Sequence, residues 1–467
     1  MKYKIRTSIL FVLLTLAIST NAQEKLTNSV RSEVESLAAA FLLQTNTPGL
    51  SIAVSKNGNI IYAEGFGYAN IEKSIAMDTT TRLRTASVAK VITATALGRL
   101  ASEGKLDFDA PIHQYVPYIN KDYAHLTTRQ LAGHTAGLPH RPRGARYKKK
   151  QYDAIKETVG LMEAPLLFEP DTDYKYSTHA YNLLAAVIEG TSGKAFLDYM
   201  NNAIFKPLGM THTGAEHIKK LTKKDAQIYY VKNGKPRLEK ITNPSYKIPG
   251  AGFRTTPSDL VKMMEAYSNG FISKKVVEEM FSSHHLKNGT KTNVGIAWRS
   301  SFDPFDNRVI EHAGSWRGAR TVIVHYPNQN LNISLMVNAN CQVLIEETAH
   351  IFAEVIRNGK IKGTTIKIPN EAVRVTYNSE KGKEVYDGTL ALNGKNGHLH
   401  TKSDGFLKSN PIHYLGTEQN YILSTKHGFI YMDLDVSNAL FGQLFIYSNR
   451  LPHNPKKETP MVTFKNK

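Results

Sequence analysis

The chain has 467 residues, 41% of them hydrophobic and 9% aromatic, which excludes a disordered protein and predicts a packed one with one large and one smaller domain. Its formal net charge of +19 favours anionic partners, but no nucleic-acid module signature accompanies that charge. The single cysteine, Cys341, excludes an intrachain disulfide. The histidines show no metal-ligand spacing, so neither a metal nor a cofactor is predicted.

The first 22 residues have the pattern of a secretory signal. Three positive charges precede an apolar run at residues 9–18, and a small-residue cleavage site ends at Ala22. The apolar run is too short to span a bilayer of roughly 30 Å. Removing residues 1–22 takes away three positive and no negative charges, which lowers the formal net charge from +19 to +16. We therefore expect an exported protein, periplasmic or secreted.

The segment that follows has an α+β pattern. Residues 30–43 have the apolar spacing of an amphipathic helix. Two apolar runs then flank Asn57-Gly58, which predicts a hairpin because type I′ turns need positive φ at both central positions. A second helical pattern begins near Ser87, and Gly104 supplies its stop.

Ser87 and Lys90 lie three residues apart at the start of that second helix. Residues i and i+3 share a helix face, so the Lys90 amine can come within hydrogen-bond reach of the Ser87 hydroxyl. A helix N-terminus also favours developing negative charge. The pair indicates a nucleophilic serine, although a serine at this position is more often a helix N-cap.

Two features of the middle region allow two interpretations each. A short helix starting at residues 127–131 ends at His134, which we interpret as a packing residue rather than a base. Residues 140–150 contain six Lys and Arg and no acid, which is typical of a solvated loop but also of a clamp for an anionic polymer.

Further along, Tyr176 ends a turn-rich loop, where a phenol can face a cleft, and residues 181–189 have a helical pattern. Ser258 or Thr255 is expected to cap a helix over residues 259–267. Strands are predicted at residues 294–298, 321–326 and 332–337.

A change of pattern near residue 361 predicts a second domain. Residues 361–370 are rich in Lys and Thr and indicate a linker. Short alternating strands follow, with Asp387-Gly388, Asn393-Gly394 and Asn396-Gly397 as turn signals, which predicts a small barrel or sandwich. The expected organisation is therefore a signal at 1–22, a main domain at 23–360, a linker at 361–370 and a C-terminal β domain at 371–467.

Three motifs together resemble those of the serine β-lactamase and penicillin-binding-protein superfamily, in its class C-like branch. They are Ser87-x-x-Lys90, Tyr176-Ser177-Thr178 and His312-Ala313-Gly314. Residues 134–138 and 250–253 support the match, which covers roughly residues 27 to 358. The C-terminal region resembles the lipocalin-like domain that many such hydrolases carry.

The resemblance implies a fold and a set of roles. The fold is α+β, an antiparallel sheet flanked by helices plus a helical lobe, followed by an all-β domain. Ser87 would form the acyl-enzyme, with Lys90 and Tyr176 sharing the proton transfer and either one acting as the base. His312, in place of the usual lysine, would donate to Tyr176 or to a substrate carboxylate. The backbone N–H groups of Ser87 and Ser315 would form the oxyanion hole, and Thr178 and Gly314 would bind substrate.

Two positions depart from the family pattern. Thr178 stands where an asparagine is usual, and Asp171 follows Pro170 where a glycine is usual. These changes leave two hypotheses. The first is an exported serine hydrolase that acts through an acyl-enzyme on an ester, a D-amino-acid amide or a peptide, as esterases, D,D-peptidases and β-lactamase relatives do. The second is a catalytically impaired, penicillin-binding-like protein that binds a cell-wall peptide or an anionic wall polymer.

Overall fold

The computed structural model describes the main domain over residues 25–142, 150–161, 164–341 and 343–358. In the C-terminal region it describes the residues of eight strands, whose bounds are given below. The predicted signal at residues 1–22 and residues 143–149 of the cationic loop lie outside the described residues. None of the helices described is both long and apolar enough to cross a membrane.

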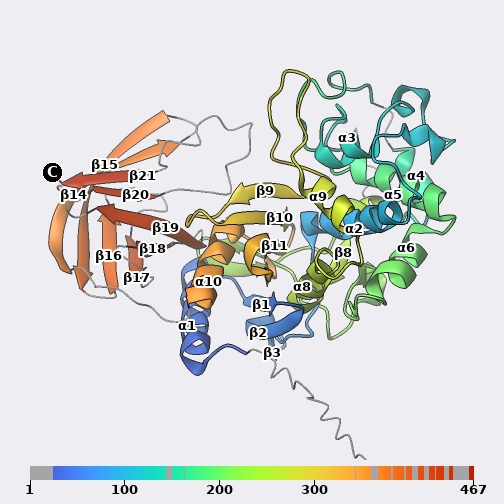
Figure 1. Ribbon diagram of the computed structural model, residues 1–467. Helices are drawn as coiled ribbons and strands as arrows, with labels where there is room; N and C mark the ends of the chain where they lie inside the picture. The colour runs from blue at the N-terminus through green and yellow to red at the C-terminus, as the bar shows by residue number, and fades with distance from the viewer. Residues whose placement is uncertain are drawn as a thin grey trace, which may run out of the picture.

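A seven-stranded antiparallel sheet runs through the main domain, with the strand order β3-β2-β1-β12-β11-β10-β9 (Figure 1). The strands are β1 (Gly49–Lys56), β2 (Asn59–Asn70), β3 (Ile75–Ala76), β9 (Arg299–Phe302), β10 (Arg308–Trp316), β11 (Ala319–Tyr326) and β12 (Leu331–Val337). Asn57 and Gly58 both have positive φ, which confirms the predicted β1–β2 hairpin.

Helices cover both faces of this sheet, and each face has its own hydrophobic core. Helices α1 (Asn28–Thr45) and α10 (Ile345–Asn358) lie on one face, and α2 (Ala89–Ser102) and α8 (Pro257–Glu265) lie on the other (Figure 1). Successive residues of β1 alternate between the cores, with Ile52 and Val54 in the α1–α10 core and Ala53 in the α2 core. The predicted helix over 30–43 is therefore confirmed, and α2 ends two residues before Gly104.

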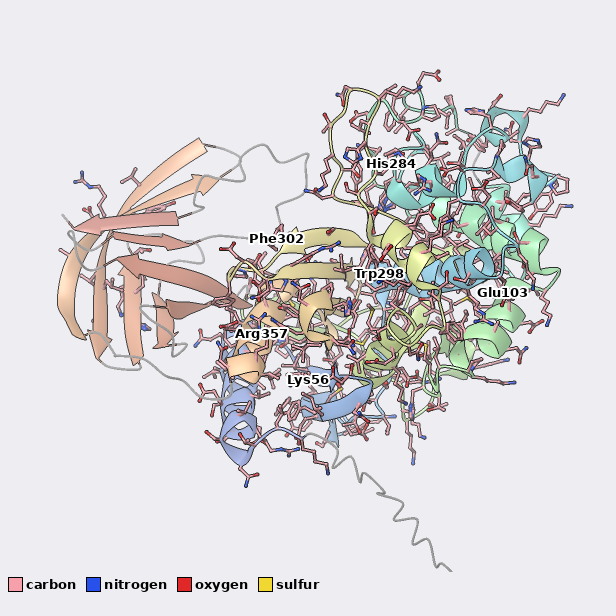
Figure 2. All side chains as sticks on the ribbon, in the orientation of Figure 1. Lys56, Glu103, His284, Trp298, Phe302 and Arg357 are labelled. Atoms are coloured by element: carbon pink, nitrogen blue, oxygen red, sulfur yellow. The ribbon has the colours of Figure 1, made fainter. Side chains whose placement is uncertain are left out.

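A helical lobe packs beyond α2. Its further helices are α3 (Thr128–Gly133), α4 (Ile155–Val159), α5 (Ala180–Ser192), α6 (Phe196–Tyr199), α7 (Ile248–Ala251) and α9 (Lys274–Phe281). Two small sheets adjoin it, formed by β4 (Leu83–Arg84), β5 (Gly214–Ala215), β6 (Tyr229–Lys232), β7 (Lys235–Leu238), β8 (Phe253–Thr255) and β13 (Ala339–Asn340). Trp298 lies inside, against Tyr267 and Phe281, where α9 meets the sheet (Figure 2).

Two local predictions were wrong. The strand begins at Arg299 rather than at residue 294, because Asn293 and Ala297 have positive φ, which interrupts an extended backbone. Helix α8 is capped by Thr256, whose hydroxyl accepts from the N–H of Asp259 at 3.2 Å. Pro257 fits at the first helical position, so the residue before it becomes the cap.

The C-terminal region forms a closed barrel in which each strand pairs with the next and β14 pairs with β21. Its described strands are β14 (Lys367–Ser379), β15 (Gly382–Asn393), β16 (Asn396–Thr401), β17 (Ser409–Tyr414), β18 (Asn420–Thr425), β19 (Gly428–Asp435), β20 (Phe441–Leu444) and β21 (Val462–Asn466). The barrel begins at Lys367, inside the predicted linker.

Two of the three predicted turns of this region lie within strands. Asp387-Gly388 lies inside β15, and Asn396-Gly397 lies in β16. A Cβ on Gly388 would lie 2.4 Å from the His400 carbonyl oxygen, so this glycine permits close strand approach instead of a turn.

The barrel packs against α1 and α10, which lie between it and the main sheet (Figure 1). Phe429 of β19 is fully buried, with its ring 6.1 Å from that of Phe41 in α1 and 6.0 Å from that of Phe352 in α10. Its N–H donates to the hydroxyl of Thr348 in α10 at 3.3 Å. The barrel is thus seated on the same two helices that cover one face of the sheet.

Candidate active site

Ser87 lies in a short 3₁₀ turn (Ala86–Val88) that leads directly into α2. Ala86 has φ of 44°, a left-handed conformation that is strained for a residue with a Cβ. The turn leaves Ser87 half-buried at the edge of a cleft. Such strain beside an exposed hydroxyl at a helix start is typical of a functional position.

Gly314 lets strand β10 approach this turn closely. A Cβ there would lie 2.5 Å from the Thr85 carbonyl oxygen and 2.9 Å from the Ser87 backbone nitrogen, so a larger residue would push the strand away. The hydroxyl of Thr321, which pairs with Gly314 in the sheet, also donates to Thr85 at 2.6 Å. These contacts bring the backbone of Gly314 and Ser315 beside Ser87.

Lys90 is completely buried one turn beyond Ser87. Its Nζ donates to the Gly250 carbonyl oxygen at 2.9 Å and to the Thr178 hydroxyl at 3.4 Å. A hydrogen bond from Lys90 to the Ser87 hydroxyl stays a prediction. Burial, helped by the charge of Arg299, holds the pKa of Lys90 well below its ordinary value. A neutral amine is therefore favoured at this position.

Tyr176 is the group that hydrogen-bonds Ser87. Burial raises the pKa of the Tyr176 phenol, while the Ser87 hydrogen bond and the Arg299 charge oppose that rise. The Lys90 Nζ lies 4.8 Å from the centre of the Tyr176 ring. The centres of the His134 and Tyr176 rings lie 4.4 Å apart. Nδ1 of His134 accepts from the Ser177 N–H at 3.3 Å, in keeping with a packing role.

Thr178 retains one contact in the place of the usual asparagine. It is buried, and its hydroxyl accepts from Lys90. A Cβ on Gly250 would lie 2.7 Å from the Thr178 carbonyl oxygen, so that glycine lets the Lys90-binding carbonyl come close. Threonine therefore helps to position the amine, although it lacks the amide donor of asparagine.

His312 is buried next to the cleft and is not part of its wall. Its Nδ1 lies 2.8 Å from the Ala313 carbonyl oxygen, which requires a proton on Nδ1. Burial, together with the charges of Arg299 and Lys90, holds its pKa well below the ordinary value. In this neutral tautomer Nε2 is an acceptor, and donation from His312 to Tyr176 or to substrate stays a prediction that requires the protonated ring.

Asp171, the second departure from the family pattern, has φ of 64°. Its carboxylate accepts from Thr135 at 2.7 Å and from Gln130 at 2.7 Å, and it pairs with His284 at 2.7 Å. Burial raises its pKa, but these hydrogen bonds outweigh burial and lower the pKa to about 2. The residue thus occupies a left-handed position suited to glycine and holds the loop that leads to Tyr176.

A buried charge pair fixes the base of the cleft. Arg84, three residues before Ser87, pairs with Glu216 at 2.6 Å, and both side chains are fully buried. The same guanidinium donates to the carbonyl oxygens of Arg317 at 3.0 Å and Thr242 at 3.1 Å. Two cleft-lining loops are therefore tied to strand β4, which lies just before the Ser87 turn.

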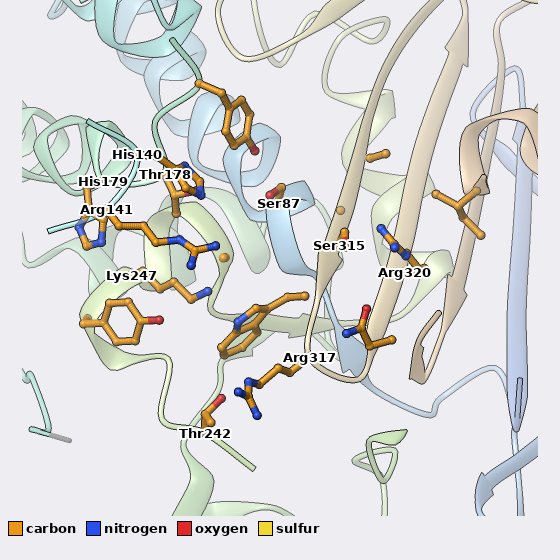
Figure 3. Close-up of a pocket in the computed structure, with 18 of the residues that line it drawn as sticks. Ser87, His140, Arg141, Thr178, His179, Thr242, Lys247, Ser315, Arg317 and Arg320 are labelled. Atoms are coloured by element: carbon orange, nitrogen blue, oxygen red, sulfur yellow. The ribbon is translucent and has the colours of Figure 1, made fainter. Parts of the chain in front are cut away.

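The cleft has a volume of about 820 Å³ and a strongly cationic wall. Of the residues that the structure describes, one acid, Glu346, lines it, against six Lys and Arg: Arg141, Lys240, Lys247, Arg299, Arg317 and Arg320. In Figure 3, Ser87 lies between Thr178, His179, Arg141 and Lys247 on one side and Ser315 and Arg320 on the other.

The structure brings the predicted residues together. Ser87, Tyr176, Thr178, Gly314 and Ser315 line the cleft, and Lys90 and His312 lie buried beside it.

Sequence reasoning missed three contributors to the site. Arg299 sets the electrostatic environment of Lys90, Tyr176 and His312. Lys247 lines the cleft, and the Gly250 carbonyl holds Lys90. No motif marked the two cations among the 59 Lys and Arg of the chain, whereas residues 250–253 had been matched without a role.

The main domain is similar to known proteins. The family model described as Beta-lactamase matches residues 30–351. Protein flp of Staphylococcus aureus (strain N315) is 24% identical over 352 residues, which are 74% of this chain and 70% of flp.

Solved structures show the same fold. D-amino acid amidase from Ochrobactrum anthropi SV3 aligns with a TM-score of 0.60 and 22% identity, covering 70% of this chain and 100% of the amidase. D-alanine carboxypeptidase AmpC from Burkholderia cenocepacia aligns with a TM-score of 0.58 and 23% identity, covering 71% of this chain and 99% of the carboxypeptidase. With the family model matching more than half of its length, the chain belongs to the beta-lactamase family, a fold family of serine hydrolases.

Proposed function

We propose that the protein is a serine hydrolase that acts through an acyl-enzyme on an ester, a D-amino-acid amide or a peptide. The observation that carries the proposal is the contact set around Ser87. Its hydroxyl bonds Tyr176, Gly314 brings β10 against its backbone, and Lys90 is buried one helical turn away. The amidase and carboxypeptidase activities named for the two structural neighbours belong to the same class of chemistry.

The proposed reaction begins with attack of Ser87 Oγ on the substrate carbonyl carbon. The serine proton passes through the Tyr176 hydroxyl to the neutral Lys90 amine, and the backbone N–H groups of Ser87 and Ser315 hold the oxyanion. The bond to the leaving group then breaks, and that group takes the proton from Lys90. Water attacks the acyl-Ser87 ester in the second half, which releases the acid and restores the serine hydroxyl.

The pKa directions favour Lys90 over Tyr176 as the proton acceptor. Burial lowers the pKa of Lys90 and raises that of Tyr176, so both groups are driven toward their neutral forms. A neutral amine can take a proton, whereas a neutral phenol with a raised pKa can only relay one. We therefore propose that the Tyr176 hydroxyl relays the proton from Ser87 to Lys90. His312 stays neutral beside them.

The decisive experiment is covalent labelling of residues 23–467. A fluorophosphonate probe and p-nitrophenyl acetate are offered to the wild type and to Ser87→Ala, with Ser177→Ala as a matched control. Ser177 is buried and bonds the Pro139 carbonyl, so it lies outside the proposed chemistry. We expect one adduct and ester turnover in the wild type and the control, and neither in Ser87→Ala.

A folded wild type that takes no label and hydrolyses no ester would contradict the hydrolase proposal. That result would support the second hypothesis, a penicillin-binding-like protein that holds a wall peptide or an anionic polymer in its cationic cleft. We also propose that the protein is exported, on the basis of the signal pattern in residues 1–22. N-terminal sequencing of the mature protein tests this proposal, with Gln23 as the expected first residue.

A further inference from the structure

Lys247 is a buried lysine whose amine faces the cleft. The residue is 8% exposed and lines the cavity beside Ser87 (Figure 3). Its Nζ lies 3.6 Å from the centre of the Trp316 ring and 5.5 Å from that of Tyr246. Among the described residues its side-chain amine forms neither a hydrogen bond nor an ion pair. A buried ammonium without an anionic partner is costly, unless a ligand supplies that partner.

The charged side chains around Lys247 are mainly cationic. The pKa values of His140 and His179 are lowered to about 4 and about 3, first by burial and then by charges that include Lys247 and Arg141. Arg141 is exposed on the same side of the cleft, where Figure 3 shows it above Lys247, and it too has no ion pair within the described part of the chain.

Glu216 and Glu346 do not neutralise this cluster. Glu216 pairs with Arg84 and Arg254, and Glu346, in the cleft wall, pairs with Arg299 at 3.5 Å. Burial and the charges of Lys90, Arg141 and Arg84 together hold the pKa of Lys247 well below its ordinary value, while Glu216 opposes them. An anion from outside the chain would relieve this repulsion.

We propose that Lys247, with Arg141, forms an anion subsite beside Ser87, and that the substrate carries a carboxylate on this side of its scissile carbonyl. The proposal rests on the serine hydrolase function above and names the substrate class. A bound carboxylate would favour the protonated form of the Lys247 amine, whose single charge it matches. Arg141 adds a second donor at the rim, and the Trp316 ring provides an apolar wall.

The test uses boronic acids, which form reversible adducts with an activated serine. Phenylboronic acid is compared with its 3-carboxy and 4-carboxy derivatives, and each dissociation constant is obtained from protection of Ser87 against the fluorophosphonate. The proteins are the wild type, Lys247→Met, Lys247→Arg and Lys240→Met. Lys240 is an exposed lysine at the rim of the same cleft and serves as the matched control.

We expect the wild type to bind at least one carboxylated compound about tenfold more tightly than phenylboronic acid, which is the range of one charge-assisted hydrogen bond. Lys247→Met should lose this preference while keeping its affinity for phenylboronic acid. Lys247→Arg and Lys240→Met should retain the preference.

Two results would overturn the subsite while leaving the hydrolase proposal intact. One is a fluorophosphonate-labelled wild type without preference for either carboxylated compound. The other is a preference that survives in Lys247→Met. A wild type that takes no fluorophosphonate at all would instead contradict the hydrolase function, and the subsite with it.

Discussion

At the scale of single residues, Lys90 and Tyr176 determine how Ser87 can be activated. Both are driven to the neutral form by burial, and Arg299 adds a positive charge that favours the neutral amine. Lys90 is held in place by a backbone carbonyl and a threonine hydroxyl, which accept its protons without supplying a negative charge. An acidic partner would have raised the pKa of Lys90, so these neutral acceptors suit a base.

This arrangement predicts the pH dependence of acylation. Because Lys90 must be unprotonated, the acylation rate should rise with pH through a pKa below 10.5 and then level off. Lys90→Met should lower the rate by roughly 10²–10⁴-fold, the range of general-base catalysis. Stopped-flow measurement of p-nitrophenyl acetate acylation from pH 5 to 11 checks both results. A rate that continued to rise above pH 10, with Lys90→Met still active, would assign the base to Tyr176 instead.

The site residues that belong to sequence motifs could be predicted from the sequence. The site residues whose role comes from their burial could not. Ser87 and Lys90 were paired by their spacing on a helix, and Tyr176 was joined to them because the three motifs together resemble those of the family. Lys247 and Arg299 were not identified, since their burial and the distances to Lys90 depend on segments far apart in sequence. The tautomer of His312 was also beyond prediction, because it is set by the carbonyl of Ala313.

At the scale of elements, the loop before Tyr176 depends on Asp171. An aspartate with φ of 64° is unusual, and the three contacts of its carboxylate to Thr135, Gln130 and His284 compensate the strain. Those partners come from α3, the turn after it and the segment after α9, so one carboxylate joins three parts of the helical lobe.

Asp171→Asn should destabilise the protein by about 1.5–3 kcal/mol, because asparagine tolerates the left-handed backbone but loses the charge-assisted bonds. Asp171 has a folded-state pKa of about 2, below its ordinary value of 3.8. Its stabilisation is therefore complete above pH 4 and is lost as the pH falls through 2.

Thermal unfolding at pH 7 and pH 3 measures this effect. The difference between the wild type and Asp171→Asn should shrink at the lower pH. Asp173→Asn is the control, because the Asp173 side chain is exposed and accepts from the neighbouring Tyr174 N–H. Equal melting temperatures for the wild type and Asp171→Asn at pH 7 would show that this loop does not depend on the carboxylate.

Element boundaries were predicted correctly where the apolar periodicity was strong. They were predicted wrongly where the φ angle of a single residue set the boundary. Helix α1 and the β1–β2 hairpin followed from apolar spacing and from Asn57-Gly58. The start of β9 did not, because the positive φ of Ala297 has no signal in its residue type. The Asp387-Gly388 pair predicted a turn. Instead, the glycine is needed because β16 packs closely against this position.

At the scale of the whole molecule, Phe429 connects the barrel to the main domain. Its ring fills a space between α1 and α10, and Gly428 before it lies so close to α10 that a Cβ would be 2.6 Å from the Thr348 hydroxyl. Phe429→Ala should cost about 3–5 kcal/mol at this contact. Val385→Ala is the control, since that barrel side chain is 52% exposed.

Hydrogen exchange followed by mass spectrometry measures the result. Backbone amides of residues 428–435 and 345–358 should exchange faster in Phe429→Ala, while β1 and β12 should keep their protection. Unchanged exchange in both segments would show that the barrel is held by contacts other than this ring.

Helix α10 contributes to two regions at once. Ile345 and Glu346 at its start line the cleft, while Thr348 and Phe352, one and two turns later, hold the barrel. A chimaera that exchanged the barrel at residues 359–366 would leave a foreign partner on this helix. The unit that keeps these contacts is therefore the barrel together with α1 and α10, and that exchange would carry two residues of the cleft wall with it.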